Sequence, residues 1–156
     1  MNNNIKILVD GDACSVMAKI ERVAKSKGIS VEIYCDPSHA IHSKYSKVRI
    51  VDAGLDSVDF AILSNVRKGD VVVTNDGGLA ALVLAKRGFA VSAHGRCYTN
   101  EMIDDVLNER YFIAKALKSG KRINRRSIKF NKPSYHYDFI NSLTNIIEKQ
   151  AFLKTA

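Results

Sequence analysis

The chain has 156 residues and a net charge of +8, with 46% hydrophobic and 26% charged residues. This length fits one domain that buries roughly 70% of its unfolded surface, and the composition excludes a fibrous or wholly disordered protein. No run approaches the roughly 20 apolar residues that cross a bilayer, and the N-terminus lacks the features of a signal peptide. We therefore predict a cytoplasmic protein with no membrane partner.

The positive charge is concentrated in one segment. Nine Lys or Arg residues and no acidic residue lie between Arg110 and Tyr137, whereas the rest of the chain has fifteen basic and sixteen acidic residues. Such a segment attracts nucleic-acid phosphates by counterion release, but it is also typical of a solvated stretch. Composition alone leaves these two interpretations about even.

The three cysteines, Cys14, Cys35 and Cys97, are widely spaced and form no CxxC pair. We predict free thiols rather than a disulfide framework or a thiolate zinc site. His39 and His42 have a helical metal-ligand spacing, but no acidic or thiol partner stands beside them. We interpret this pair as a loop feature.

Short apolar runs alternate with segments of helical periodicity along the first two thirds of the chain. Gly28 and Gly88 are expected to end helices, and Thr99 to cap one. The predicted strands are 5–9, 29–34, 48–51, 71–74 and 89–93, and the predicted helices are 14–27, 56–66, 78–87, 99–117 and 138–153.

Strands separated by helices need crossover connections, so the sheet should be largely parallel and covered on both faces. We predict a three-layer α/β fold with five strands and an added C-terminal helix. The expected division is an α/β domain at 1–118, a basic connecting segment at 119–133, and a C-terminal helix at 134–156 that packs on the same domain.

Several aspartates follow the predicted strands, at the edge where open parallel sheets bind ligands. Mg²⁺ prefers such oxygen ligands, and two carboxylates about 5 Å apart repel by roughly 3 kcal/mol at an effective dielectric of 20. A cluster would therefore be costly without a cation. The strand-end aspartates are Asp10 and Asp12, Asp36, Asp52 and Asp76, and Asp59 lies in the first turns of a helix.

Helix capping is the alternative explanation for some of these residues. Asp12 and Asp76 stand just before helices, where an Asp cap is worth about 1 kcal/mol. Capping does not readily explain Asp10, which ends an apolar strand two residues before another acid. From the residues alone, metal binding is slightly favoured over pure capping.

Six segments together resemble the YaiI/YqxD family, a largely uncharacterised bacterial family, over about Ile5 to Gly120. The resemblance implies a branch of the PIN-domain-like nuclease fold with strand order 3-2-1-4-5, which would bring Asp10, Asp12 and Asp76 together. The segments are Val9–Cys14, Val51–Gly54, Asp56–Asp59, Val72–Asp76, Gly78–Ala80 and Tyr98–Glu101.

The resemblance also implies a site. Its catalytic metal ligands would be Asp10, Asp12, Asp59 and Asp76, holding Mg²⁺ or Mn²⁺ ions that activate water for phosphodiester hydrolysis. Asp56 is the reserve ligand, and Thr74 and Asn75 would orient a carboxylate or contact phosphate. Where many members have Arg-Gly before the Tyr-Thr motif, this chain has His94-Gly95-Arg96, so a basic group is displaced by two positions. The residues predicted to bind nucleic acid are Arg96, Lys121, Arg122, Arg125, Arg126 and Lys129.

The leading hypothesis is a metal-dependent nuclease, with RNA favoured over DNA as the partner. It depends on the aspartate cluster and on the basic segment, in which Phe130, Tyr135 and Tyr137 could stack on bases. A haloacid-dehalogenase-type phosphatase, with Asp10 as nucleophile, and a non-catalytic RNA-binding or regulatory module remain alternatives. The sequence does not set the oligomeric state, and a homo-oligomer stays open.

Overall fold

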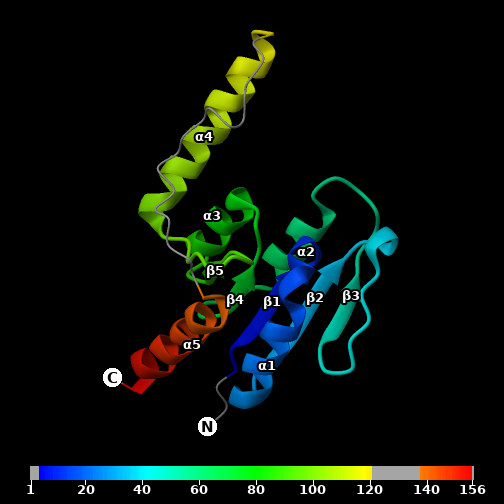
Figure 1. Cartoon of the computed structure of the whole chain (residues 1–156), viewed down its shortest axis with the longest axis vertical. Helices are drawn as coiled ribbons and strands as arrows, with labels where there is room; N and C mark the ends of the chain where they lie inside the picture. Colours follow the sequence, from blue (N-terminus) through cyan, green and yellow to red (C-terminus); the bar gives the residue numbers. More distant parts are fainter. Residues whose placement is uncertain (1–3, 121–137, 156) are drawn as a thin grey trace.

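The computed structural model describes residues 4–120 and 138–155 and has one five-stranded, all-parallel sheet (Figure 1). The strand order is β3-β2-β1-β4-β5, which confirms both the α/β class and the predicted order. The strands are β1 (Lys6–Asp10), β2 (Ser30–Cys35), β3 (Lys47–Ile50), β4 (Val71–Val73) and β5 (Phe89–Val91).

Helices cover both faces of this sheet. Helices α1 and α5 pack together against one face, and α2 and α3 pack against the other. The helices are α1 (Met17–Lys27), α2 (Ser57–Asn65), α3 (Gly77–Ala85), α4 (Asn100–Lys118) and α5 (Phe139–Thr155), with 3₁₀ turns η1 (Gly11–Val16) and η2 (Pro37–His39).

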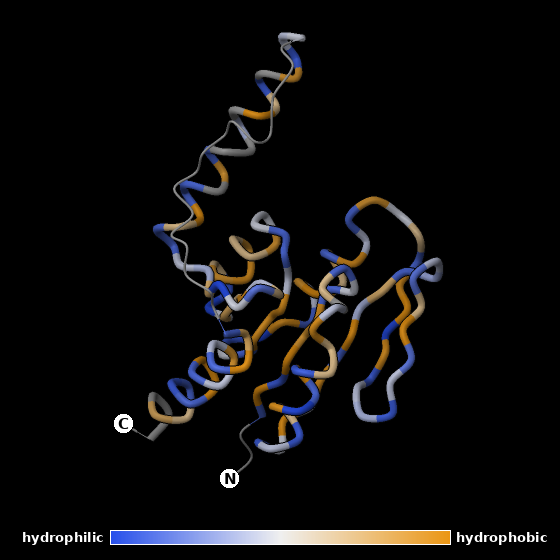
Figure 2. Tube along the Cα trace, viewed as in Figure 1, coloured by the Kyte–Doolittle hydropathy of each residue, from blue (hydrophilic) through white to orange (hydrophobic). Residues whose placement is uncertain are grey.

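The alternation of side chains along β1 explains why the layers form on both faces. Ile7 and Val9 are fully buried in the core beneath α1 and α5, whereas Leu8 is fully buried in the core beneath α2 and α3. Successive strand residues point to opposite faces, so a continuous apolar run needs cover on both. Figure 2 shows the central strands as mainly hydrophobic.

The register of β1 and β4 sets the edge at which the candidate site lies. Val9 is level with Val73 in this parallel pair, so Asp10 and Thr74 leave the sheet side by side. The two positions are 64 residues apart in the chain. The sheet alone therefore brings the Asp10-Gly11-Asp12 and Thr74-Asn75-Asp76 segments together.

The last two helices are placed very differently. Helix α5 buries Phe139, Leu143 and Ile147 in the core it shares with α1. Helix α4 begins at the predicted Thr99 cap, whose hydroxyl accepts the Met102 N–H at 3.3 Å, and then extends away from the sheet (Figure 1). Within residues 4–120 and 138–155, no helix is both long enough and apolar enough to span a membrane.

Two predicted helix boundaries differ in the structure. The segment before α1 is a 3₁₀ turn, so the α-helix begins at Met17 rather than Cys14. Helix α3 ends at Ala85, and Arg87 rather than Gly88 takes the left-handed conformation, with φ of 61°. Gly88 serves close packing instead, because a Cβ there would lie 2.9 Å from Val83 Cγ1.

Candidate metal centre

Thr74 links the ends of β1 and β4 at the candidate site. Its hydroxyl donates a hydrogen bond to Asp10 Oδ2 at 2.9 Å and accepts one from the Asp76 N–H at 3.0 Å. The other Asp10 oxygen, Oδ1, accepts the Asp12 N–H at 3.2 Å. Thr74 is therefore a positioning residue that fixes the Asp10 carboxylate and holds the backbone carrying Asp76 next to it.

The surroundings of Asp10 disfavour the ionised form of its carboxyl group. It is 5% exposed, and this burial raises its pKa, while the hydrogen bonds from the Asp12 N–H and the Thr74 hydroxyl lower it. The negative charges of Asp12 and Asp76 raise the pKa further. Desolvation and like charge both oppose ionisation, and a bound cation would relieve both effects.

Gly11 fixes the path of the chain between the first two acids. A Cβ at this position would lie 2.8 Å from the Tyr34 carbonyl oxygen and 3.1 Å from Cys35 Cβ. Any side chain would have to displace the backbone of β2. The Asp10-Gly11-Asp12 turn is thus pressed against the neighbouring strand, which limits how far the two acids can move apart.

The capping interpretation holds for Asp76 but not for Asp12. Asp76 Oδ1 accepts the N–H groups of Gly78 at 2.8 Å and Leu79 at 3.2 Å, and so caps α3. Asp12 lies exposed in η1, where its N–H is bound by Asp10. A carboxylate offers about four lone-pair sites, so capping by Asp76 is compatible with metal binding as well.

The start of α2 supplies two further acids. Asp56 precedes the helix in a left-handed conformation, with φ of 61°, and Asp59 lies in the first turn. The pKa of Asp59 is raised to about 6, first by desolvation and then by the charges of Asp76, Asp10, Asp56 and Asp12. All four predicted ligands therefore interact electrostatically, together with the reserve residue Asp56.

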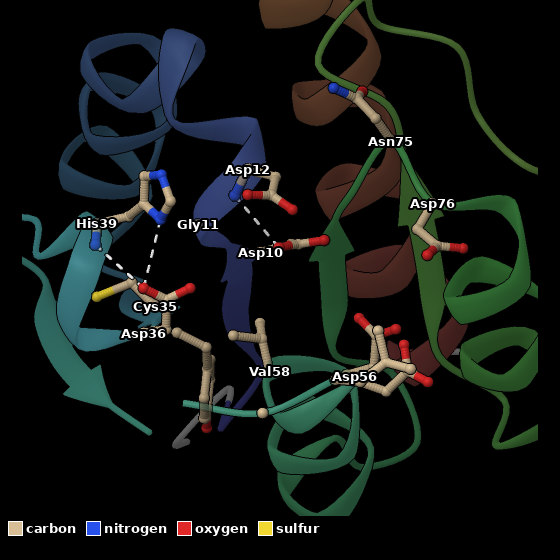
Figure 3. Close-up of a pocket in the computed structure, with 14 residues that line it drawn as sticks. Asp10, Gly11, Asp12, Cys35, Asp36, His39, Asp56, Val58, Asn75 and Asp76 are labelled. Carbon is tan, nitrogen blue, oxygen red and sulfur yellow. Dashed lines mark hydrogen bonds and ion pairs between the residues drawn. The ribbon is translucent and has the colours of Figure 1, made fainter. Parts of the chain in front are cut away.

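These carboxylates line one hollow of about 480 Å³, which we call the acidic hollow. In Figure 3, Asp10 and Asp12 approach it from one side, Asp76 from the opposite side, and Asp56 from below. No Lys or Arg in the described part of the chain lines it. The aspartates in its lining are Asp10, Asp12, Asp36, Asp56, Asp59 and Asp76.

The donor set of the acidic hollow fits a hard divalent cation in its chemistry. As placed, the described residues include no group of three or more His, Cys, Asp or Glu side chains that could enclose a metal ion. Mg²⁺ does not need such an enclosure, because it commonly keeps several waters and binds through one or two carboxylates. A hollow of this size leaves room for a partly hydrated ion and a phosphate oxygen.

The structure separates the two predicted support residues. Thr74 contacts Asp10, as expected of a residue that orients a carboxylate. Asn75 also lines the hollow, but its Oδ1 accepts the Ala93 N–H at 2.9 Å, and its side chain points away from the acids (Figure 3). Asn75 therefore secures the loop after β5 instead of directing a metal ligand.

Asp36 and His39 were not among the predicted ligands, although both have side chains that can bind a metal. Asp36 caps η2 by accepting the N–H groups of Ser38 and His39, and His39 Nδ1 lies 3.3 Å from Asp36 Oδ1. Both line the hollow. The position of Asp36 after β2 was the available sequence signal, whereas the approach of His39 depends on the η2 turn.

Arg96 lies outside the acidic hollow. It lines a separate depression of about 270 Å³, with Lys149 of α5, Ser142 and Cys97, which we call the basic hollow. The pKa of Cys97 is raised by burial, partly offset by the nearby Lys149 charge and a hydrogen bond from Ser142. The other predicted nucleic-acid-binding residues, Lys121, Arg122, Arg125, Arg126 and Lys129, and the aromatic Phe130, Tyr135 and Tyr137, lie outside the described residues.

Comparison with known proteins decides the family. A family model described as the uncharacterised YaiI/YqxD family matches residues 8–149. The chain belongs to the YaiI/YqxD family. A UPF0178 protein of Clostridium acetobutylicum is 43% identical over 118 residues, covering 76% of this chain and 80% of the relative.

A second relative supports the same family assignment. A UPF0178 protein of Clostridium tetani is 43% identical over 123 residues, covering 78% of this chain and 84% of the relative. No solved structure matches the chain. The names of these YaiI/YqxD relatives state no activity, so the function has to be argued from the site.

Proposed function

We propose that this YaiI/YqxD protein is a nuclease that hydrolyses phosphodiester bonds, with RNA favoured, at Mg²⁺ or Mn²⁺ held in the acidic hollow. The observation that carries the proposal is six aspartates around one hollow without a lysine or arginine in its described lining. A phosphodiester is an anion, so it would be repelled from this lining unless a cation stood between them. A divalent ion supplies that charge, lowers the pKa of a bound water and stabilises the leaving oxygen.

The residues have different parts in this proposal. Asp10 and Asp12 would hold the ion from the β1 side, with Asp76 and Asp59 facing them. Both carboxylate oxygens of Asp10 accept hydrogen bonds, which fix its orientation. Asp59, whose pKa is raised to about 6, is ionised in most molecules at neutral pH, and a nearby cation would stabilise this ionised form. Thr74 keeps Asp10 and Asp76 in register.

The test is metal-dependent cleavage by the purified full-length chain. With Mn²⁺ the protein should cut a labelled pool of single-stranded RNA, and it should not do so in EDTA. Asp10→Asn should reduce the rate by at least about 100-fold, because it removes a charge from the metal shell. Asp52→Asn is the matched control, since Asp52 follows β3 yet does not line the acidic hollow.

Equal cutting by the parent and Asp10→Asn would exclude this hollow as the catalytic site. Metal-dependent hydrolysis of a small phosphate monoester, with no cleavage of RNA or DNA, would favour a haloacid-dehalogenase-type phosphatase instead. Binding of RNA that persists in EDTA, without cleavage under any metal, would favour the non-catalytic module.

A further inference from the structure

An apolar depression adjoins the acidic hollow between α2 and α3. It measures about 260 Å³ and shares Asp56, Asp59 and Asp76 with the acidic hollow. Its remaining lining is almost entirely apolar, and we call this part the apolar shelf. The shelf consists of Phe60, Leu63, Leu79 and Leu82.

Two large apolar side chains of the shelf are exposed to solvent, although burying them would stabilise the fold. Phe60 is 68% exposed and Leu82 is 53% exposed, whereas Leu79 at the base is 2% exposed. Single exposed apolar residues are common, but here an aromatic ring and a leucine on neighbouring helices flank one depression, which makes it a candidate binding surface. Phe60 follows Asp59 directly, so the aromatic ring and a candidate metal ligand share one turn of α2.

We propose that the apolar shelf is a nucleobase subsite, in which Phe60 stacks on the base next to the phosphate held in the acidic hollow. This inference rests on the proposed function, and it names the part of the substrate that the site would recognise. Stacking on an aromatic side chain accepts any base, because every base has a π-face.

Size and continuity favour a base over other occupants. A depression of about 260 Å³ lies below the 300–1,000 Å³ typical of sites that enclose drug-sized ligands, so it suits one planar group. The three shared aspartates place the shelf directly beside the candidate phosphate position. A polynucleotide carries a planar apolar ring beside every phosphate, and no other common phosphodiester combines these groups along its whole length.

The substrate class follows from the stacking. A base in a duplex is stacked on its neighbours and paired, so it reaches a protein ring only when it is unstacked at an energetic cost. The shelf therefore selects unpaired nucleotides. We expect single strands, loops and ends to bind, and continuous duplexes to bind more weakly.

A tryptophan introduced at position 60 would report base stacking through its fluorescence. The chain contains no tryptophan, so Phe60→Trp introduces a unique fluorophore into the shelf. In Mn²⁺, a single-stranded RNA oligonucleotide should quench this fluorescence, while the matching duplex and an abasic strand of the same length should quench it far less. Leu107→Trp is the matched control, because Leu107 is exposed on α4 and does not line the shelf, so this variant should show little quenching.

The second measurement uses Phe60→Ala. Loss of one stacking contact should weaken binding of the single strand by about 10-fold, and Phe60→Tyr should retain the affinity. The increase in melting temperature on adding Mn²⁺ should be the same in Phe60→Ala as in the parent, because the carboxylates are unchanged. Because Phe60 is exposed, its replacement by alanine should change the stability of the fold only slightly.

The fluorescence titration reports binding rather than turnover, so it gives an answer even if no cleavage is found. Quenching without cleavage would support the base subsite while the nuclease proposal fails. Equal quenching by the abasic strand, or equal quenching in Leu107→Trp, would overturn the subsite. A change of sedimentation from dimer to monomer in Phe60→Ala would also overturn it, because the shelf would then be covered by a second copy of the chain.

Discussion

The acidic hollow and the basic hollow carry opposite charge on one small domain. The acidic hollow gathers six aspartates from the ends of three strands and the start of α2, whereas the basic hollow presents Arg96 and Lys149 between the loop after β5 and α5. The net charge of +8 therefore says nothing about the candidate catalytic site, whose local charge has the opposite sign. An anion can approach the basic hollow unaided, but it needs a cation to approach the acidic one.

The largest expected effect comes from removing one charge of the acidic hollow. Asp59→Asn should reduce metal-dependent cleavage by about 100-fold, because a candidate ligand is lost. The same change should raise the metal-free melting temperature at neutral pH, since it removes a carboxylate that Asp76 and Asp10 repel. A cleavage assay in Mn²⁺ measures the first effect and thermal unfolding without metal measures the second, and Asp52→Asn should change neither. A lower metal-free melting temperature would contradict the idea of a hollow under electrostatic strain.

Thr74→Val tests the hydroxyl that positions two acids without itself carrying charge. The variant removes the donor to Asp10 and the acceptor for the Asp76 N–H while keeping the buried volume. Metal affinity should fall by about 10- to 100-fold, the range seen when a group that orients a metal ligand is lost. Thr74→Ser should recover most of this affinity in a calorimetric titration. If Thr74→Val and Thr74→Ser bound the metal with equal affinity, the role of the Thr74 side chain would be purely steric.

The pH dependence of metal binding tests the role of Asp59 in the acidic hollow. The pKa of Asp59 is raised to about 6, above its ordinary value of 3.8, so the folded chain holds this proton more tightly than the unfolded chain. The metal-free fold should lose this stabilising contribution as pH rises from about 4 to about 6. A metal ion competes with the same proton, so Mg²⁺ affinity should increase about 10-fold between about pH 5 and about pH 7 and then level off. An affinity that falls over this range would contradict the assignment.

The smallest expected effect lies in the basic hollow. Arg96→Ala combined with Lys149→Ala should weaken single-stranded RNA binding only a few-fold, but should lower the slope of log affinity against log salt by about one unit for each charge removed. Metal-induced stabilisation should not change, because neither residue lines the acidic hollow. An unchanged salt slope would show that the basic hollow makes no phosphate contact.

Sequence pattern predicted the parallel α/β class, and the resemblance to the YaiI/YqxD family implied the strand order; together they place the features that depend on the backbone. The apolar run of β1 and its position beside β4 determine that Asp10, Asp12 and Asp76 meet at one edge of the sheet. The predicted fold class and strand order are confirmed. Parallel strands align their carboxyl ends, so the placement of strand-end residues follows once the order is known.

Features that depend on competing side-chain contacts were not predictable. Asn75 follows the same strand as Thr74, yet it turns away to bind the Ala93 N–H, and only the observed loop after β5 offers that donor. Arg96 is close to the strand ends in sequence, but its loop directs it to α5. Phe60 was assigned no role from the sequence, and its exposure beside the acids is set by how α2 packs next to α3.

The pairing of β1 with β4 also has a consequence for the order of folding. Asp10 and Thr74 meet across 64 residues, so the complete cluster cannot exist until this long-range pairing has formed. Local segments such as the β1–η1–α1 unit can form earlier because they close much shorter loops. Metal binding should therefore follow formation of the sheet rather than nucleate it. In refolding experiments, a metal-dependent signal would then mark the late step at which the two halves of the sheet join.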